Sequence, residues 1–216
     1  IAGVWPVDCG QILIDGKDIS ALPEHKRAPY LGRVFQDPMT GTVADMEIIE
    51  NLAIAARRGK KRGISWGVKA DERIRYRQML AEFDLGLEDR MSSKVGLLSG
   101  GQRQAITLLM ATIKKPKLLL LDEHTAALDP KTAAKVLELS DKIIAENNLT
   151  ALMVTHNMHD AITHGNRLIM MSDGKIILDI SGEEKKNLTV EHLLEMFEKA
   201  SGSKLENDRM LLSKDK

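Results

Sequence analysis

The feature of this sequence that most restricts its fold is a run of four leucines that ends in two acidic residues. Leu118–Leu121 is continuously apolar, and Asp122 and Glu123 follow it directly. A run without polar alternation is typical of a strand that is covered on both faces, as in a parallel sheet. In open α/β sheets, ligands bind beyond the carboxyl ends of the strands, where both carboxylates would then lie. Because adjacent carboxylates repel each other, the sequence favours a cation site or a catalytic role over the alternative, a solvated acidic turn.

A glycine pair at the start of a predicted helix precedes this strand. Ser99-Gly100-Gly101-Gln102 has the spacing of a capping box, with Ser99 as the N-cap. Each glycine costs roughly 1 kcal/mol relative to alanine within a helix. The pair leaves the free backbone N–H groups and the positive end of the helix dipole uncovered, which predicts an anion site. The alternative is a capped helix that happens to contain glycines.

Three further polar residues end predicted strands or start a predicted helix. Gln36 ends the predicted strand 31–36, where a plain polar cap is the alternative to a functional role. His156 follows the predicted buried strand 149–155 at its carboxyl end, and its expected place beside the carboxylates favours a phosphate contact over a structural role. Asp129 precedes a proline at a predicted helix start, so capping alone would account for it. The spacing of the remaining histidines does not match that of metal ligands.

The segment between the first predicted strands and the glycine pair has a helical rather than a strand-like pattern of apolar residues. Residues 47–58 and 71–83 carry apolar side chains at helical spacing, and no strand-like run separates them. This pattern predicts a helical subdomain inserted into the α/β core. The basic stretch 57–63 between the two helices favours a solvated loop, and contact with a membrane surface or nucleic acid is the alternative.

The C-terminal part predicts a β-hairpin and a helix. Residues 167–180 read as two strands around the turn Asp173-Gly174. Residues 189–200 place apolar side chains on one helical face, and the tail from Ser201 is polar.

The composition restricts the function only weakly. Lysine plus arginine equals aspartate plus glutamate, 31 of each, which gives no support for general nucleic-acid binding. The single cysteine, Cys9, permits no intrachain disulfide, which suits a reducing compartment. No apolar run has the length of a transmembrane helix, so a membrane partner would be another polypeptide or another part of the gene product.

Together these motifs resemble those of the ATP-binding cassette (ABC) ATPases, the engines of ABC transporters. Leu98–Gln102 resembles the signature motif, and Leu118–Glu123 resembles the Walker B motif with its catalytic glutamate. Val34–Pro38 resembles the Q-loop, Ala127–Asp129 the D-loop, and Val154–His156 the switch histidine. The motifs occur in the family's order and span nearly the whole chain. Two positions depart from the pattern, and we expect tuning rather than loss of activity from them: His124 replaces the usual proline and Ala126 the usual serine.

One motif of the family does not occur in this sequence. A P-loop has the form Gly-x-x-x-x-Gly-Lys-Ser/Thr. The residues five before the glycines of the Gly-Lys pairs are Gln11, Ile54 and Ile169, so none of the pairs qualifies. In the family the P-loop lies just before the segment that Ile1–Gly3 resembles. We therefore expect an N-terminally truncated cassette that is inactive alone.

The resemblance implies an α/β fold, a P-loop NTPase core with a mostly parallel sheet and an inserted helical subdomain. The expected parts are residues 1–36 and 99–183 as the two parts of the core, 37–98 as the helical subdomain, and 184–216 as a C-terminal helix and tail.

The resemblance also implies ATP hydrolysis with Mg²⁺. Asp122 would hold the ion through water, and Glu123 would be the general base or polariser of the attacking water. Gln36 would sense the magnesium ion and the nucleophile, and His156 would contact the γ-phosphate.

The family works as pairs of cassettes that sandwich two ATP molecules head to tail. Residues 99–102 would bind the γ-phosphate of the opposite site, and Asp129 would communicate across the dimer. The expected partners are a second copy as a homodimer, a transmembrane permease and a solute-binding protein, at the cytoplasmic face of the membrane, with no nucleic acid.

The expected process is bacterial uptake of an amino-acid-like solute, since the short cassette and the segment 206–212 resemble such systems. Two alternatives remain open. One is an ABC ATPase of the DNA-repair or translation type. Sequences that resemble this type carry long coiled-coil insertions or two cassettes in one chain, and neither feature is visible in this sequence. The other is a degenerate interaction protein without hydrolysis, which would not need Glu123 and His156.

Overall fold

The computed structural model describes residues 1–60 and 67–201. The chain divides between Val154 and Thr155 into two compact units. Residues 61–63 of the predicted basic loop and the predicted tail beyond Ser201 lie outside the described residues. The predicted boundaries at residues 36, 98 and 183 stay predictions.

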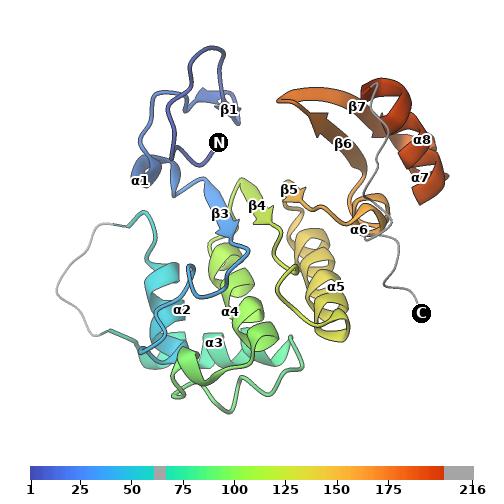
Figure 1. Cartoon of the computed structure of the whole chain (residues 1–216). Coiled ribbons are helices and arrows are strands. Elements are labelled where there is room, and N and C mark those ends of the chain that lie inside the picture. The colour runs from blue at the N-terminus through green and yellow to red at the C-terminus, as the bar shows by residue number, and fades with distance from the viewer. Residues whose placement is uncertain (61–66, 202–216) are drawn as a thin grey trace. The chain divides into compact units, whose positions relative to one another are not determined.

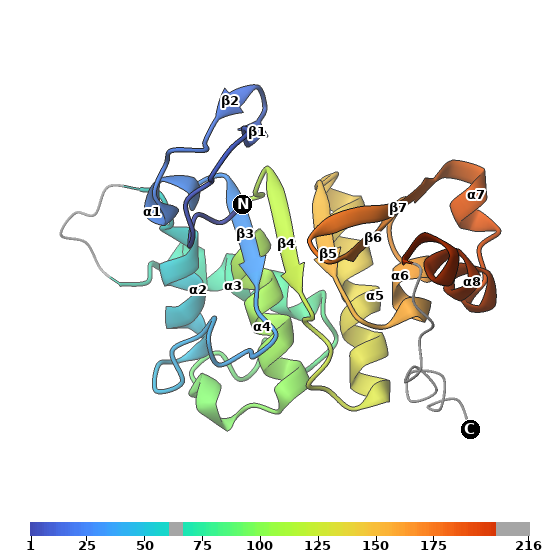
Figure 2. The ribbon, with the colours of Figure 1, turned by 45° about the horizontal axis from the view of Figure 1, so that its top comes forward.

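A three-stranded parallel sheet forms the centre of the first unit, in the order β3–β4–β5 (Figures 1 and 2). β3 spans Leu31–Val34, β4 spans Leu118–Asp122 and β5 spans Ala151–Val154. The register pairs the last residue of β3 with Leu121 and the last residue of β5 with Asp122. All three strands therefore end at one edge, which confirms the predicted parallel α/β core.

Two helices, α4 (Gly100–Thr112) and α5 (Pro130–Asn147), pack on one face of this sheet (Figure 2). Leu119 and Leu121 point into the shared core and are at most 2% exposed. Close packing of α4 on β3 requires Gly32, because a Cβ there would lie 2.6 Å from a backbone oxygen of α4.

The opposite face of the sheet is less covered than the leucine run predicts. Leu120 is half-buried, and Leu152 and Val154 are 40% and 51% exposed. Side chains alternate between the two faces of a strand, so packing α4 and α5 on one face leaves every second residue to the other. The predictions of a strand covered on both faces at 118–121 and of a buried strand at 149–155 are therefore wrong for this face.

The segment between β3 and α4 is helical, as predicted. It contains α2 (Ile48–Ala56), α3 (Ala70–Ala81) and a 3-10 helix, η1 (Val95–Leu97), and no strand among its described residues. Fully buried side chains from this segment and from α4 belong to the same hydrophobic cluster, among them Leu52, Tyr76, Leu80, Leu87 and Ile106. The helical insertion is therefore packed on the sheet through α4.

The first residues of the chain form a small antiparallel pair and a short helix. β1 (Leu13–Ile14) and β2 (Lys17–Asp18) flank a turn, and α1 (Glu24–Arg27) follows. Arg27 is 2% exposed and donates to three backbone carbonyls, including that of Ile1 at 2.8 Å. This buried guanidinium fixes the N-terminal segment.

The second unit contains the predicted hairpin. β6 (Arg167–Ser172) pairs antiparallel with β7 (Lys175–Ser181). Three helices accompany the hairpin: α6 (Met158–Thr163), α7 (Gly182–Lys186) and α8 (Val190–Ser201). Its small core consists of Leu168, Ile180, Leu188 and Leu193. Among the described residues, the structure has no helix with the length and apolar character needed to span a membrane.

Candidate functional site

Two of the predicted site residues meet at the carboxyl edge of the sheet. The side-chain Nε2 of Gln36 donates a hydrogen bond to Oε2 of Glu123 at 3.1 Å. Gln36 lies two residues beyond β3, and Glu123 follows β4 directly. The parallel pairing of these two strands thus brings together side chains that are 87 residues apart in the sequence.

The backbone of Glu123 is fixed in an unusual conformation. Its φ of 43° lies in the left-handed region, which residues other than glycine rarely adopt. Its N–H donates to the carbonyl of Val154 at 2.9 Å, and its carbonyl accepts from the N–H of Ala126 at 3.0 Å. These two bonds end the strand ladder and reverse the chain, so the carboxylate projects from a defined turn. Such conformations are concentrated at functional sites.

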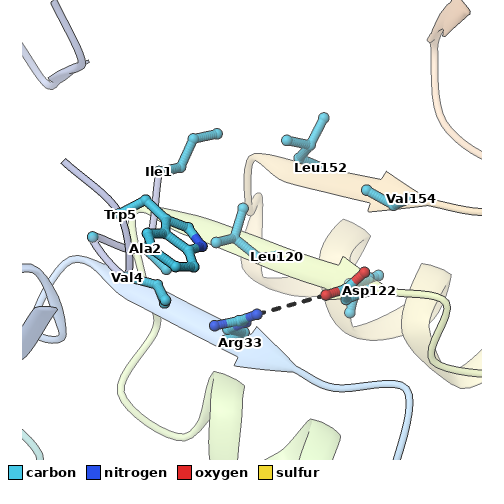
Figure 3. Close-up of a pocket in the computed structure, with 11 residues that line it drawn as sticks. Ile1, Ala2, Val4, Trp5, Arg33, Leu120, Asp122, Leu152 and Val154 are labelled. Carbon is cyan, nitrogen blue, oxygen red and sulfur yellow. Dashed lines mark ion pairs between the residues drawn. The ribbon is translucent and has the colours of Figure 1, made fainter. Parts of the chain in front are cut away.

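Asp122 forms an ion pair with a residue that sequence reasoning missed. Arg33 Nη2 lies 3.6 Å from Asp122 Oδ2, and both side chains are partly exposed. The guanidinium of Arg33 also lies 4.4 Å from the centre of the Phe35 ring. Figure 3 shows this pair at an open pocket that is lined by the first five residues and by side chains of β3, β4 and β5. The pocket has a volume of about 300 Å³. The available signal for Arg33 was a charged residue within an otherwise mostly apolar predicted strand.

The donor atoms at this edge fit a magnesium ion that is held together with phosphates. Asp122 and Glu123 offer carboxylate oxygens and Gln36 an amide oxygen, the hard donors that Mg²⁺ prefers. Within residues 1–60 and 67–201, no cluster of three or more His, Cys, Asp or Glu side chains could hold a metal ion. Because Mg²⁺ in nucleotide sites is bound by one or two carboxylates plus phosphate and water, this limited set suits a nucleotide-bound ion.

The predicted capping box at the start of α4 is confirmed. The N–H of Gln102 donates to Ser99 Oγ, and the N–H of Ser99 donates to Gln102 Oε1, both at 3.3 Å. Ser99 and Gly100 are exposed, so the first turn of α4 is accessible to solvent. Binding of a phosphate by this turn stays a prediction.

The start of α4 packs closely on the start of α5, which sequence reasoning missed. A Cβ on Gly101 would lie 2.0 Å from Cγ2 of Thr132, a distance that non-bonded carbon atoms do not adopt. A Cβ on Gly100 would lie 3.2 Å from Leu128 Cδ2. Packing on Thr132 is therefore sufficient reason for a glycine at position 101, whether or not an anion binds. No local pattern around Thr132 announces this contact.

Asp129 is the N-cap of α5, as its sequence context predicts. Its Oδ1 accepts from the N–H of Thr132 at 3.1 Å. The hydrogen bonds from Thr132 lower the pKa of the exposed Asp129 carboxyl below its ordinary value, which is 3.8. Communication across a dimer stays a prediction for this residue.

His156 belongs to the second unit and lies exposed in the turn before α6. Thr155 Oγ1 accepts from the N–H of Asn157 at 3.0 Å, and Asn157 in turn caps α6 through the N–H of Asp160. These bonds define the local backbone around His156. Its contact with a γ-phosphate stays a prediction.

His124, one of the two departures from the family pattern, is buried. Its Nε2 lies 3.0 Å from Ser140 Oγ on α5, and both residues are 2% exposed. Because Ser140 Oγ donates its own proton to the carbonyl of Val136 at 2.8 Å, it accepts from an Nε2–H of His124. The residue after Glu123 is thus tied to the middle of α5.

Comparisons with known proteins identify the family of the chain. The profile of the ABC transporter family matches residues 1–126. A tyrosine transport ATP-binding protein of Clostridioides difficile (strain R20291) is 46% identical over 200 residues, which cover 93% of this chain and 79% of that protein. The spermidine/putrescine import ATP-binding protein PotA of Haemophilus ducreyi (strain 35000HP / ATCC 700724) is 36% identical over 194 residues, or 88% of this chain and 49% of PotA. The chain thus spans about half the length of that relative.

Solved structures show the same fold. An ATP-binding cassette of an ABC transporter in its ADP conformation superimposes with a TM-score of 0.72 at 26% identity, over 90% of this chain and 79% of that one. A nucleotide-free ATP-binding cassette from an ABC transporter gives a TM-score of 0.70, also at 26% identity, over 91% and 80%. The chain therefore belongs to the ABC transporter family, as an ATP-binding subunit with the P-loop NTPase fold.

Proposed function

We propose that this chain is the ATP-hydrolysing subunit of an ABC importer for an amino-acid-like solute. The observation that carries the proposal is the 3.1 Å hydrogen bond between Gln36 and Glu123, next to Asp122 at the carboxyl edge of the parallel sheet. This edge is where open α/β sheets bind nucleotides.

Glu123 acts in this proposal as the general base. The hydrogen bond from Gln36 orients its carboxylate, and the fixed turn at φ 43° sets the direction of the side chain. The carboxylate then takes a proton from the water that attacks the γ-phosphate. Asp122, with Gln36 beside it, would hold Mg²⁺ through water, and the bound ion would neutralise charge on the phosphates.

The remaining candidates act on phosphate and on a second copy of the chain. Ser99 and Gly100 are exposed at a helix start with a complete capping box, and Gly101 is buried next to them; this helix start supports phosphate binding by Ser99, Gly100 and Gly101 in the opposite site of a homodimer. His156 would contact the γ-phosphate, and Asp129 would communicate between the two subunits.

The nature of the solute rests on the relatives. The tyrosine transport ATP-binding protein is 46% identical to this chain, and PotA is 36% identical. The match covers 79% of the tyrosine transport protein and 49% of PotA. We therefore favour an amino acid, tyrosine first, over a polyamine. A transmembrane permease would bind the chain at the cytoplasmic face of the membrane, and a solute-binding protein would deliver the solute.

A transport assay tests the proposal. The full gene product is reconstituted with its permease in vesicles, and accumulation of radiolabelled tyrosine is followed with and without ATP. We expect ATP-dependent accumulation that excess tyrosine suppresses and excess spermidine does not. Accumulation of spermidine alone would overturn the proposed solute, and the lack of any ATP-dependent transport with either solute would overturn the proposed import function.

The binding of ATP to residues 1–216 by themselves is a separate test. Residues 1–216 contain no Gly-x-x-x-x-Gly-Lys-Ser/Thr motif. They therefore lack the loop and the lysine with which this motif binds the β- and γ-phosphates. We infer that this chain alone binds ATP weakly and does not hydrolyse it. Calorimetric titration with ATP and Mg²⁺ should show no tight binding; micromolar affinity with turnover would contradict this inference.

A further inference from the structure

A buried glutamine on α4 holds the backbone next to Gln36. Gln104 is 1% exposed, and its Nε2 donates to the backbone carbonyl of Phe35 at 3.1 Å. The two residues are 69 positions apart in the sequence. Phe35 directly precedes Gln36, whose own side chain donates to Glu123. Two successive hydrogen bonds therefore lead from the helix that begins after Ser99 to the carboxylate of Glu123.

The amide of Gln104 is costly at this position. Its Oε1 is buried and accepts no hydrogen bond from any residue in the described part of the chain. Burying a polar atom without a partner is unfavourable, and such an atom in a folded protein needs an explanation. Ala105, Ile106 and Leu108 are buried apolar neighbours on α4, and the buried Thr107 bonds to a carbonyl of its own helix, so Gln104 differs from them in carrying a buried polar atom without a partner. The bond to Phe35 is the evident reason for an amide.

Phe35 is held from a second direction by Arg33. The guanidinium of Arg33 lies over the Phe35 ring, 4.4 Å from its centre, and also pairs with Asp122 at 3.6 Å. β3 ends at Val34, so Phe35 lies just outside the strand. Gln104 of α4 thus holds the carbonyl of Phe35, and Arg33 of β3 holds its ring. Gln36 is the next residue in the chain after Phe35.

We propose that Gln104 is a positioning residue, which holds Gln36 in place for its contact with Glu123 and links the start of α4 to the catalytic carboxylate of the same chain. This proposal rests on the proposed function where it concerns catalysis. A shift of the nucleotide-facing turn of α4 would move the Phe35 carbonyl, and with it the amide of Gln36. Displacement of a catalytic group by about 1 Å can slow a reaction by about 100-fold.

The first test concerns geometry and needs no ATP. Gln104→Met has a similar length, removes the donor and also removes the unpaired acceptor. Thr112→Val is the matched control, because Thr112 is a buried polar residue of the same helix whose hydroxyl bonds only within α4, to Leu108 and Leu109. The side-chain amide signals of Gln36 in an ¹⁵N NMR spectrum, assigned with Gln36→Glu, are the readout. We expect them to shift and broaden in Gln104→Met and to stay unchanged in Thr112→Val.

The second test concerns catalysis in the full transporter. We expect Gln104→Met to lower kcat for ATP by about 10- to 100-fold and to change KM less, because Asp122 and the start of α4 are untouched and only Gln36, with the orientation of the base, is displaced. Its thermal midpoint should stay at or above that of Thr112→Val. In a Gln36→Ala background, Gln104→Met should cause no further loss, since Gln104 acts through Gln36.

The possible outcomes separate the two proposals. An unchanged Gln36 signal together with normal kcat in Gln104→Met overturns the positioning role. If Gln104→Met does not fold, Gln104→Leu serves instead, since it also removes the donor and the unpaired acceptor; normal kcat in that variant also overturns the role. A wild-type transporter without ATP hydrolysis would overturn the proposed function, while the NMR result would still decide the linkage.

Discussion

The contact between the starts of α4 and α5 predicts the effect of adding one methyl group, in Gly101→Ala. The new Cβ would lie 2.0 Å from Thr132 Cγ2, whereas carbon atoms in contact are about 3.5–4.0 Å apart. Either the two helix starts separate or Thr132 leaves its rotamer. Inserting a methyl group into a packed contact costs about 1–3 kcal/mol. The higher helix propensity of alanine returns at most about 1 kcal/mol. We therefore expect Gly101→Ala to lower the free energy of unfolding by about 1–2 kcal/mol.

A second substitution identifies the methyl group that causes this loss. Thr132→Ser removes Cγ2 alone, and the next atoms of Thr132 lie 3.5 and 3.9 Å from the new Cβ, which are ordinary contact distances. The double variant Gly101→Ala/Thr132→Ser should therefore be at least as stable as Thr132→Ser, since the helix propensity of alanine is then gained without the clash. Gly100→Ala is the control, because its Cβ would meet only the end of a flexible leucine side chain at 3.2 Å.

Urea unfolding of these variants provides the double-mutant cycle. The expected coupling between positions 101 and 132 is about 1–2 kcal/mol, well above the error of additivity between independent sites. An equal loss of stability from Gly101→Ala in both backgrounds would refute the steric argument, and so would a neutral Gly101→Ala.

Two further predictions concern α5. Ser140→Ala removes the hydrogen-bond partner that lies 3.0 Å from the buried His124 Nε2. In the same urea assay it should lower the free energy of unfolding by about 1–3 kcal/mol. A change below about 0.5 kcal/mol would show that this bond is not needed for stability. Asp129→Asn keeps a capping side chain but removes the charge. Because the pKa of Asp129 is lowered, its carboxylate adds stability above pH 3.8, and this stability is lost as the pH falls through the lowered pKa. The thermal midpoint of the wild type should therefore exceed that of Asp129→Asn at neutral pH, and the gap should close in acid; a gap that widens in acid would contradict the assignment.

The parts of the structure that the sequence predicts well are those encoded within a few neighbouring residues. The capping box of Ser99, the cap of Asp129 and the turn of the hairpin at Asp173-Gly174 each depend on residues one to four apart, and the structure contains all three. The α/β class also follows, because the apolar run before Asp122 is a parallel strand with its acidic end at the carboxyl edge of the sheet.

The parts that the sequence does not predict depend on contacts between distant segments. Gln104 meets Phe35 across 69 residues, and nothing near either residue indicates this bond. The fit of Gly101 against Thr132 depends on how two helices cross, which a local pattern cannot specify. The leucine run indicates burial on both faces because hydrophobicity alone does not say which face the neighbouring helices cover.

The catalytic role of Glu123 is the central claim, and Glu123→Gln tests it most directly. The amide keeps the size of the side chain but cannot accept the proton of the attacking water. In the full gene product assembled with its permease, steady-state phosphate release should slow by about 10²–10⁴-fold. ATP binding should persist, so the variant should accumulate as an ATP-bound dimer. Asp122→Asn should differ by weakening magnesium-dependent binding as well.

Glu138→Gln is the matched control, because Glu138 is an exposed glutamate in the middle of α5. Phosphate release and the fraction of dimer with ATP are measured for the wild type and all three variants. The account predicts normal release in Glu138→Gln, and a loss of release with retained ATP binding in Glu123→Gln. Phosphate release by Glu123→Gln close to that of the wild type would contradict it, and would reduce Asp122 and Glu123 to an acidic turn.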